Sequence, residues 1–174
     1  MENYIFTKGN IEESISIMKE AANWLIDINY PIWDINKLTQ TEFENSPLDF
    51  VVMWKNKQSI ATLLLTYEDT IFWPELSKNS SGFIHKLSIR REFAGQNLAK
   101  KIIEFAIDEC IAKNIYRLRL ECDSKRKKLC NFYESLGFKL IKIKLYDNKI
   151  PKNGVAYYDS VLELAYYELN LQNL

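Results

Sequence analysis

A strand, a helix and a second strand follow one another in the middle of the chain, and this order limits the fold more than any other feature. Residues 83–89 (FIHKLSI) are typical of a strand, residues 97–113 repeat apolar side chains at helical spacing, and residues 115–121 alternate apolar with charged side chains. Such a βαβ unit predicts two parallel strands joined by a right-handed crossover. Ligands of open α/β sheets bind beyond the carboxyl ends of the strands, so we expect a site just after residue 89.

Further elements surround this unit and can belong to the same sheet. Asn10 is placed to cap the first helix, and Lys55-Asn56-Lys57 separates the two strands of a hairpin. The expected helices cover about residues 11–28, 38–45, 97–113 and 127–137, and the other strands cover residues 4–7, 50–54, 59–67, 138–146 and 160–169. The sequence predicts a single domain over residues 1–174 of the α/β (α+β) class. Its sheet is mixed, mostly antiparallel and twisted, with about seven strands, the parallel βαβ unit at its centre and about four flanking helices.

Charge is balanced over the whole chain but unevenly distributed along it. Lysine plus arginine and aspartate plus glutamate both number 23, which argues against a nucleic-acid-binding protein. The first 80 residues are mainly acidic, whereas residues 81–128 are mainly basic. We therefore expect the middle of the chain to attract anions, if its charges converge in the fold.

Cysteine and histidine usage bounds the chemistry further. The 3 cysteines, at positions 110, 122 and 130, form no C-x-x-C pair and suit a reducing compartment such as the cytoplasm. A single histidine, His85, makes a zinc site unexpected, so we expect no metal. No run approaches the eighteen or so apolar residues that cross a bilayer, and the first residues lack an apolar signal core.

The segment from Arg91 to Lys101 (REFAGQNLAKK) has the features of a loop that binds phosphate groups. Gly95 and Ala99 permit close approach of the backbone, and a helix begins directly afterwards. The start of a helix offers unpaired backbone N–H groups and the positive end of the helix dipole. Asn97 is compatible with this use, because asparagine tolerates positive φ and any residue except proline supplies the N–H group.

This loop, the segment NFYESLGF at residues 131–138 and the order of elements together resemble the GNAT superfamily of N-acetyltransferases. The resemblance covers nearly the whole chain and implies the acyl-CoA N-acyltransferase fold. The pyrophosphate-binding pattern of that family, Q/R-x-x-G-x-G/A, maps onto residues 94–99. Ala94 replaces the usual arginine or glutamine, and Asn97 replaces the first glycine.

The resemblance implies transfer of an acetyl group from acetyl-CoA to a primary amine, on a small molecule or a peptide, by direct attack in a ternary complex. Tyr133 matches the tyrosine beside the CoA sulfur and would protonate the leaving thiolate, unless it only packs in the core. The residues implied in cosubstrate binding are Leu87, Ser88, Ile89, Ala94, Gly95, Gln96, Asn97, Leu98, Ala99 and Lys100. The alternative is a CoA-binding module without catalysis, in which Ala94 and Asn97 are signs of decay.

Several points stay open at this level. The base that deprotonates the amine can be Glu121, His85 or a chain of water molecules. Lys100 or Lys101 can replace part of the charge missing at position 94, and residues 125–128 (KRKK) either meet the CoA phosphates or form a solvated helix start. The amine that accepts the acetyl group is not identified. The last strand can pair with its counterpart in a homodimer, but the sequence does not decide the oligomeric state. The residues expected on the acceptor side are Glu42, Glu44, Asp49, Trp24, Trp33, Trp54 and Trp73.

Overall fold

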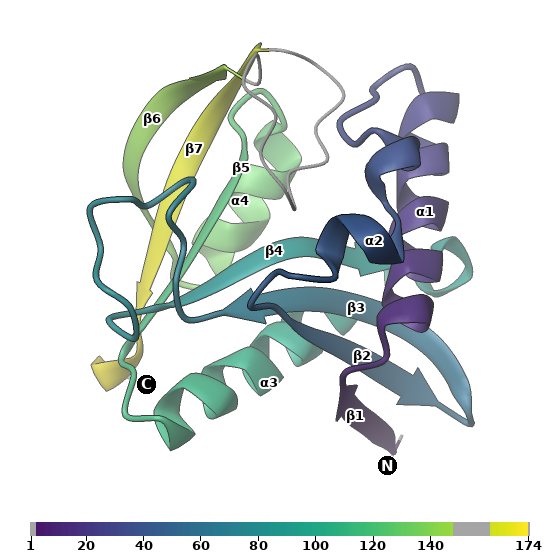
Figure 1. Ribbon diagram of the computed structural model, residues 1–174, viewed down its shortest axis with the longest axis horizontal. Helices are drawn as coiled ribbons and strands as arrows, with labels where there is room; N and C mark the ends of the chain where they lie inside the picture. The colour runs from purple at the N-terminus through teal and green to yellow at the C-terminus, as the bar shows by residue number, and fades with distance from the viewer. Residues whose placement is uncertain (1–2, 148–160, 174) are drawn as a thin grey trace.

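The computed structural model describes residues 3–147 and 161–173, which form one seven-stranded sheet in the order β1-β2-β3-β4-β5-β7-β6. Only β4 and β5 run parallel, and every other neighbouring pair is antiparallel. The mixed, mostly antiparallel sheet with a central βαβ unit is therefore confirmed (Figure 1). The strands are β1 (Tyr4–Lys8), β2 (Asp49–Lys55), β3 (Gln58–Thr66), β4 (Gly82–Ile89), β5 (Arg117–Asp123), β6 (Lys139–Asp147) and β7 (Val161–Asn170).

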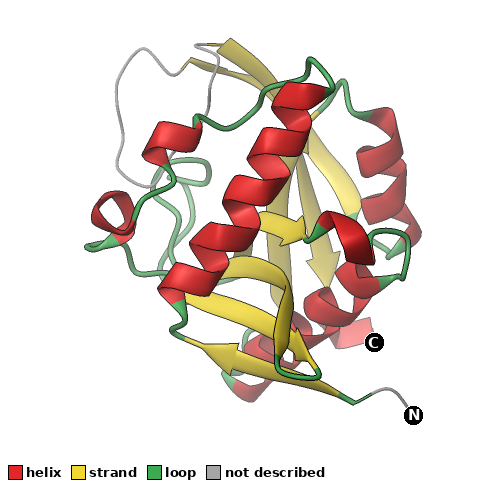
Figure 2. Ribbon diagram, turned by 90° about the vertical axis from the view of Figure 1, so that its right-hand side faces the viewer, coloured by secondary structure: helices red, strands yellow, loops and turns green. Residues whose placement is uncertain are grey.

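Four α-helices cover the two faces of the sheet (Figure 2). Alternate residues of the central strands divide between two cores: Leu64 packs with α1 and α2, whereas Leu63 packs with α3 and α4. The helices are α1 (Ile11–Asp27), α2 (Gln40–Phe43), α3 (Leu98–Ala112) and α4 (Lys127–Ser135). The helices on both faces leave little of the central strands exposed, which explains why β3 is almost wholly buried.

The two parallel strands pair only at their beginnings. The register between β4 and β5 runs from Gly82–Leu118 to Ile84–Leu120. On the other side of β4, a bulge places Lys86 and Leu87 opposite a single residue of β3, and Lys86 takes a φ of 49°. The end of β4 therefore turns away from β5 and leaves its main chain unpaired on that side. This divergence opens the sheet where the sequence predicts the site.

The local predictions hold with small shifts. The hairpin turn is confirmed, since Asn56 and Lys57 have φ values of 50° and 67°. The cap predicted at Asn10 is wrong: its side chain makes no capping bond, and its Nδ2 instead donates to Oγ1 of Thr7 at 2.6 Å. Strand β5 lies two residues later than expected, at Arg117–Asp123.

The last strand does not offer a free edge. Strand β7 lies between β5 and β6, so main-chain pairing of β7 with a second copy is not available. The edge strands among the described residues are β1 and β6. The expected loop around Pro151 and Gly154 lies outside the described residues. Within residues 3–147 and 161–173, no helix has both the length and the apolar character needed to span a bilayer.

Candidate functional site

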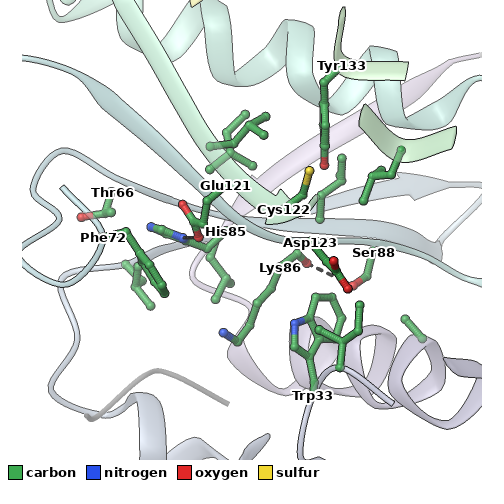
Figure 3. A pocket seen from close by; sticks show the side chains of 18 of the residues that line it. Trp33, Thr66, Phe72, His85, Lys86, Ser88, Glu121, Cys122, Asp123 and Tyr133 are labelled. Carbon is green, nitrogen blue, oxygen red and sulfur yellow. Dashed lines mark hydrogen bonds and ion pairs between the residues drawn. The ribbon is translucent and has the colours of Figure 1, made fainter. Parts of the chain in front are cut away.

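A pocket of about 610 Å³ lies where β4 and β5 separate (Figure 3). Its walls come from the ends of these two strands, from α1 and the segment after it, from the loop before α3 and from α4. Leu87, Ser88 and Ile89 line it, as expected from the sequence. Because β5 has diverged at this level, their main-chain groups on the β5 side are open to a ligand. Their role in binding an acyl carrier stays a prediction.

The loop before α3 has the geometry of an anion site. Gly95 and Asn97 both take left-handed conformations, with φ values of 80° and 59°. In the described part of the chain, the main-chain N–H groups of Gly95, Gln96 and Asn97 have no hydrogen-bond partner, and Asn97 leaves the start of α3 without a side-chain cap. The first N–H groups of α3, from Leu98 to Lys100, are unpaired as in any helix start. The residues present therefore fit a diphosphate.

Ala94 differs from its neighbours in this loop. Its N–H group donates to the carbonyl oxygen of Arg91 at 3.1 Å, which closes a short 3-10 turn at Arg91–Phe93. Its methyl side chain provides no charge. The contribution predicted for Ala94 is thus restricted to the shape of the loop, and the N–H groups available to an anion begin at Gly95.

Tyr133 projects from α4 toward the pocket. Its ring packs against Phe138 and Tyr167 in the core, and its hydroxyl points to the region of Cys122 (Figure 3). Within residues 3–147 and 161–173, that hydroxyl makes no hydrogen bond to the protein. Burial raises the pKa of Tyr133 well above its usual range, so the phenol keeps its proton at neutral pH. The side chain has the state and the position of a proton donor to a group in the pocket.

His85 lies between two buried carboxylates. Its Nδ1 is 3.0 Å from Oε1 of Glu121, and its Nε2 is 3.4 Å from Oδ2 of Asp69. Both carboxylate side chains are only 4% exposed. Burial alone would lower the pKa of His85, but the charge of Glu121, its hydrogen bond and the charge of Asp69 together raise it above the ordinary value of 6.5. The raised pKa increases the protonated fraction of the imidazole at a given pH.

One carboxylate oxygen of this cluster is buried without a hydrogen-bond partner among the described residues. In the described part of the chain, Oε2 of Glu121 is buried without a hydrogen-bond partner, while Oε1 contacts His85. Oδ2 of Asp69 lies within ion-pair distance of the imidazole but is not aligned for a hydrogen bond. Asp69, His85 and Glu121 also bring their ligand atoms within 4.8 Å of one another, a spacing compatible with a cation. The expectation that the protein uses no metal stays a prediction.

The raised pKa of His85 gives a pH dependence with a defined sign. A group whose pKa is raised by folding stabilises the folded state fully below its unfolded pKa, near 6.5, and loses this contribution as the pH rises through the folded pKa. Because His85 is the 1 histidine of the chain, NMR titration of imidazole protons measures it without ambiguity. We expect a pKa above 6.5 in the folded protein and about 6.5 in urea. A folded value at or below that of the unfolded chain would contradict the arrangement.

Lys86 extends into the pocket beside Trp33 from the strained position in the bulge (Figure 3). Burial lowers the pKa of its amine to about 8, against the attraction of Glu121 and Glu42, so part of the population is neutral near physiological pH. Nothing in the linear sequence marks this lysine, because its orientation depends on the bulge between β3 and β4. It adds a cation to the part of the pocket nearest α1 and α2.

The aromatic and acidic residues expected around the acceptor only partly converge. Trp24 and Trp33 line the pocket, whereas Trp54 donates to Thr7 at 2.8 Å and Trp73 packs in a separate core. Asp49 forms an ion pair with Lys8 at 3.9 Å instead. Glu42 and Glu44 are absent from the pocket lining, and the acidic groups that do line it are Glu68, Asp69, Glu121 and Asp123.

Comparison with known proteins agrees with this geometry. The model of the acetyltransferase (GNAT) family matches residues 18–138. An uncharacterized N-acetyltransferase of Bacillus subtilis, YesJ, is 24% identical over 142 residues, which are 74% of this chain and 77% of that protein. An N-acetyltransferase structure from Staphylococcus aureus has a TM-score of 0.64 at 17% identity, covering 97% of this chain and 99% of that one. A putative acetyltransferase from Salmonella typhimurium, solved with its cofactor acetyl-CoA, has a TM-score of 0.62 at 13% identity, covering 97% of this chain and 94% of that one.

Proposed function

The chain belongs to the acetyltransferase (GNAT) family, and from this premise we propose that it transfers an acetyl group from acetyl-CoA to a primary amine in a ternary complex. One observation carries the proposal: the unpaired main-chain N–H groups from Gly95 to Asn97 stand in the chain between Arg91 and Ala99, and both of these residues line the pocket that Tyr133 also lines. An anion-binding loop and a protonated phenol in one pocket are what binding and protonation of a CoA thiolate require.

Different segments of the chain bind the cosubstrate and protonate its leaving group. Bound acetyl-CoA supplies the thioester carbonyl and the thiolate leaving group. The main chain of Leu87, Ser88 and Ile89 holds and orients the arm of the cosubstrate, and the loop from Gly95 to Lys100 holds its phosphates. The phenol of Tyr133 donates its proton to the leaving sulfur.

Deprotonation of the amine requires a general base. Oε2 of Glu121 is buried and has no hydrogen-bond partner among the described residues, so it has the capacity to take the proton, directly or through water, whereas His85 contacts the other oxygen of the same carboxylate. His85 orients the carboxylate of Glu121. The proton passes from the amine to Glu121 either directly or through a water molecule, and both routes belong to this proposal.

Calorimetric titration with acetyl-CoA, followed by a thiol-release assay on a panel of amines, tests the function. The panel contains polyamines, aminoglycosides, amino acids and peptides with free amino termini. We expect saturable binding and release of CoA thiol with at least one class of amine. Tight binding without turnover on any amine would identify a CoA-binding module without catalysis, and absence of binding would contradict the proposal altogether.

A further inference from the structure

The pocket reaches both faces of the sheet, and its two ends carry different groups. Tyr133 belongs to the core under α3 and α4, whereas Nζ of Lys86 lies 5.8 Å from the ring centre of Phe43, which packs in the core under α1. Figure 3 shows Tyr133 and Lys86 on opposite sides of the strands. In the proposed function the thioester meets Tyr133, so the acceptor amine approaches from the end at Lys86.

Two buried carboxylates beside this end have the capacity to bind one ammonium group. The side chains of Glu121 and Asp69 are each 4% exposed, and neither Oε2 of Glu121 nor Oδ2 of Asp69 has a hydrogen-bond partner within residues 3–147 and 161–173. A buried oxygen without a donor is costly, so a ligand that brings an N–H group to it gains affinity. While both carboxylates are ionised, their cluster with His85 is negative in either protonation state of the imidazole.

The other carboxylates that line the pocket already have partners. Glu68 forms an ion pair with Lys78 at 3.6 Å. Asp123 accepts a hydrogen bond from the hydroxyl of Tyr30 at 2.7 Å and another from the main-chain N–H of Lys125 at 2.9 Å. A second ammonium group on the acceptor would have to displace these contacts. The pocket therefore suits an acceptor with one ammonium group better than a polyamine.

Lys86 brings a positive charge to the same end of the pocket. It follows His85 in the chain and takes a φ of 49°, a conformation that is costly for lysine. Burial lowers the pKa of Lys86 to about 8, against the attraction of Glu121, so most of the population is charged at pH 7. A second cation also faces the pocket wall, since the guanidinium of Arg91 lies 3.9 Å from the ring centre of Trp24. An anionic group on the acceptor would be attracted to this end, whereas a further cation would be repelled.

We propose that the acceptor is an amino acid, whose amino group lies against the carboxylates of Glu121 and Asp69 and whose own carboxylate pairs with Lys86. Each charge of the ligand then meets an opposite charge of the pocket, and binding adds no net charge. During transfer the N–C bond forms as the C–S bond breaks, and Tyr133 protonates the sulfur. Of the two protons that leave the ammonium group by way of Glu121, one replaces the proton of Tyr133 and the other goes to solvent. The inference rests on the proposed function and narrows its acceptor from primary amines to this class.

A panel of α-, β- and γ-amino acids, followed by matched analogues of the best acceptor, tests the inference. The analogues are its carboxamide, which has no negative charge, and its decarboxylated amine. In Lys86→Met, kcat/KM for the amino acid should fall about 10- to 100-fold, mainly through a higher KM, whereas kcat/KM for each analogue should change less than about threefold. The ratio of variant to native for one acceptor cancels the basicity of that acceptor. Lys86→Arg should recover part of the loss.

Lys144→Met is the matched control, because Lys144 is exposed on β6 and does not line the pocket. It should leave each kcat/KM within about twofold of the native value, and urea unfolding checks that both methionine variants are folded. The native chain gives a second measurement without any variant: kcat/KM should be at least about tenfold higher for the amino acid than for the decarboxylated amine.

Two outcomes would overturn the inference. One is an equal loss for the amino acid and both analogues in Lys86→Met, and the other is a native chain that acetylates polyamines or the decarboxylated amine as well as any amino acid. In both cases the proposed transfer to a primary amine would still stand. A native chain that acetylates no amine at all would instead refute the proposed function.

Discussion

Replacement of Tyr133 by phenylalanine should lower the turnover number about 100-fold or more, while the affinity for acetyl-CoA changes less than about twofold. The hydroxyl points into the pocket and makes no hydrogen bond within the described residues, so its removal breaks no hydrogen bond of the protein. The ring stays packed on Phe138 and Tyr167, so the fold is preserved. What disappears is the proton that the raised pKa keeps on the phenol at neutral pH.

Steady-state rates and calorimetry on the same preparations measure the two quantities separately. Tyr116→Phe is a matched control, because that hydroxyl is on an exposed side chain and its partner is Asn114 at 3.4 Å. It should leave both quantities unchanged. Equal turnover by Tyr133→Phe and the native enzyme would remove the proton-donor role from Tyr133.

Replacement of Ala99 by glutamate should reduce acetyl-CoA affinity by about 100-fold or more, because it puts a carboxylate in the first turn of α3, where the phosphates are expected. Ala99 lines the pocket, and α3 has no acidic residue in its first turn. The same carboxylate interacts favourably with the helix dipole, so the folded state should keep its stability or gain about 0.3–1 kcal/mol. Loss of binding without loss of stability is the distinctive outcome.

Ala99→Gln separates charge from bulk, since its side chain has nearly the same size and no charge. It should retain much more affinity than the glutamate variant. Calorimetry gives the affinities, and urea unfolding gives the free energies of unfolding. If both variants bind acetyl-CoA as the native protein does, the start of α3 is not the phosphate site.

The loop before α3 shows how much the sequence alone could predict. Asparagine at position 97 departs from the family pattern, but asparagine is among the few residues that tolerate positive φ, and the φ of 59° shows that this position uses that tolerance. The βαβ unit was equally accessible, since alternation in residues 115–121 and helical spacing in residues 97–113 are local signals. The open N–H groups follow from the same local geometry.

Other parts of the site depend on contacts between distant segments. Asp69 belongs to a loop, and only the fold brings it to His85, so no local pattern indicates a carboxylate on each side of the imidazole. The bulge that turns Lys86 into the pocket arises from pairing with β3. The availability of Lys100 likewise depends on its neighbour, since its side chain pairs with Glu104 at 3.9 Å. Local patterns predict elements, whereas the charge state and availability of a group are properties of its three-dimensional surroundings.

The divergence of β4 from β5 affects the stability of the folded state. In the sheet, strands β1–β4 are joined to strands β5–β7 only by the pairing of β4 with β5. That pairing covers only the beginnings of the two strands. A molecule bridging the open end takes part in the cohesion between the two halves, and its binding free energy adds to that of folding by mass action. The lifetime of the folded chain, and its resistance to proteases, would then follow the concentration of the molecule that fills the gap.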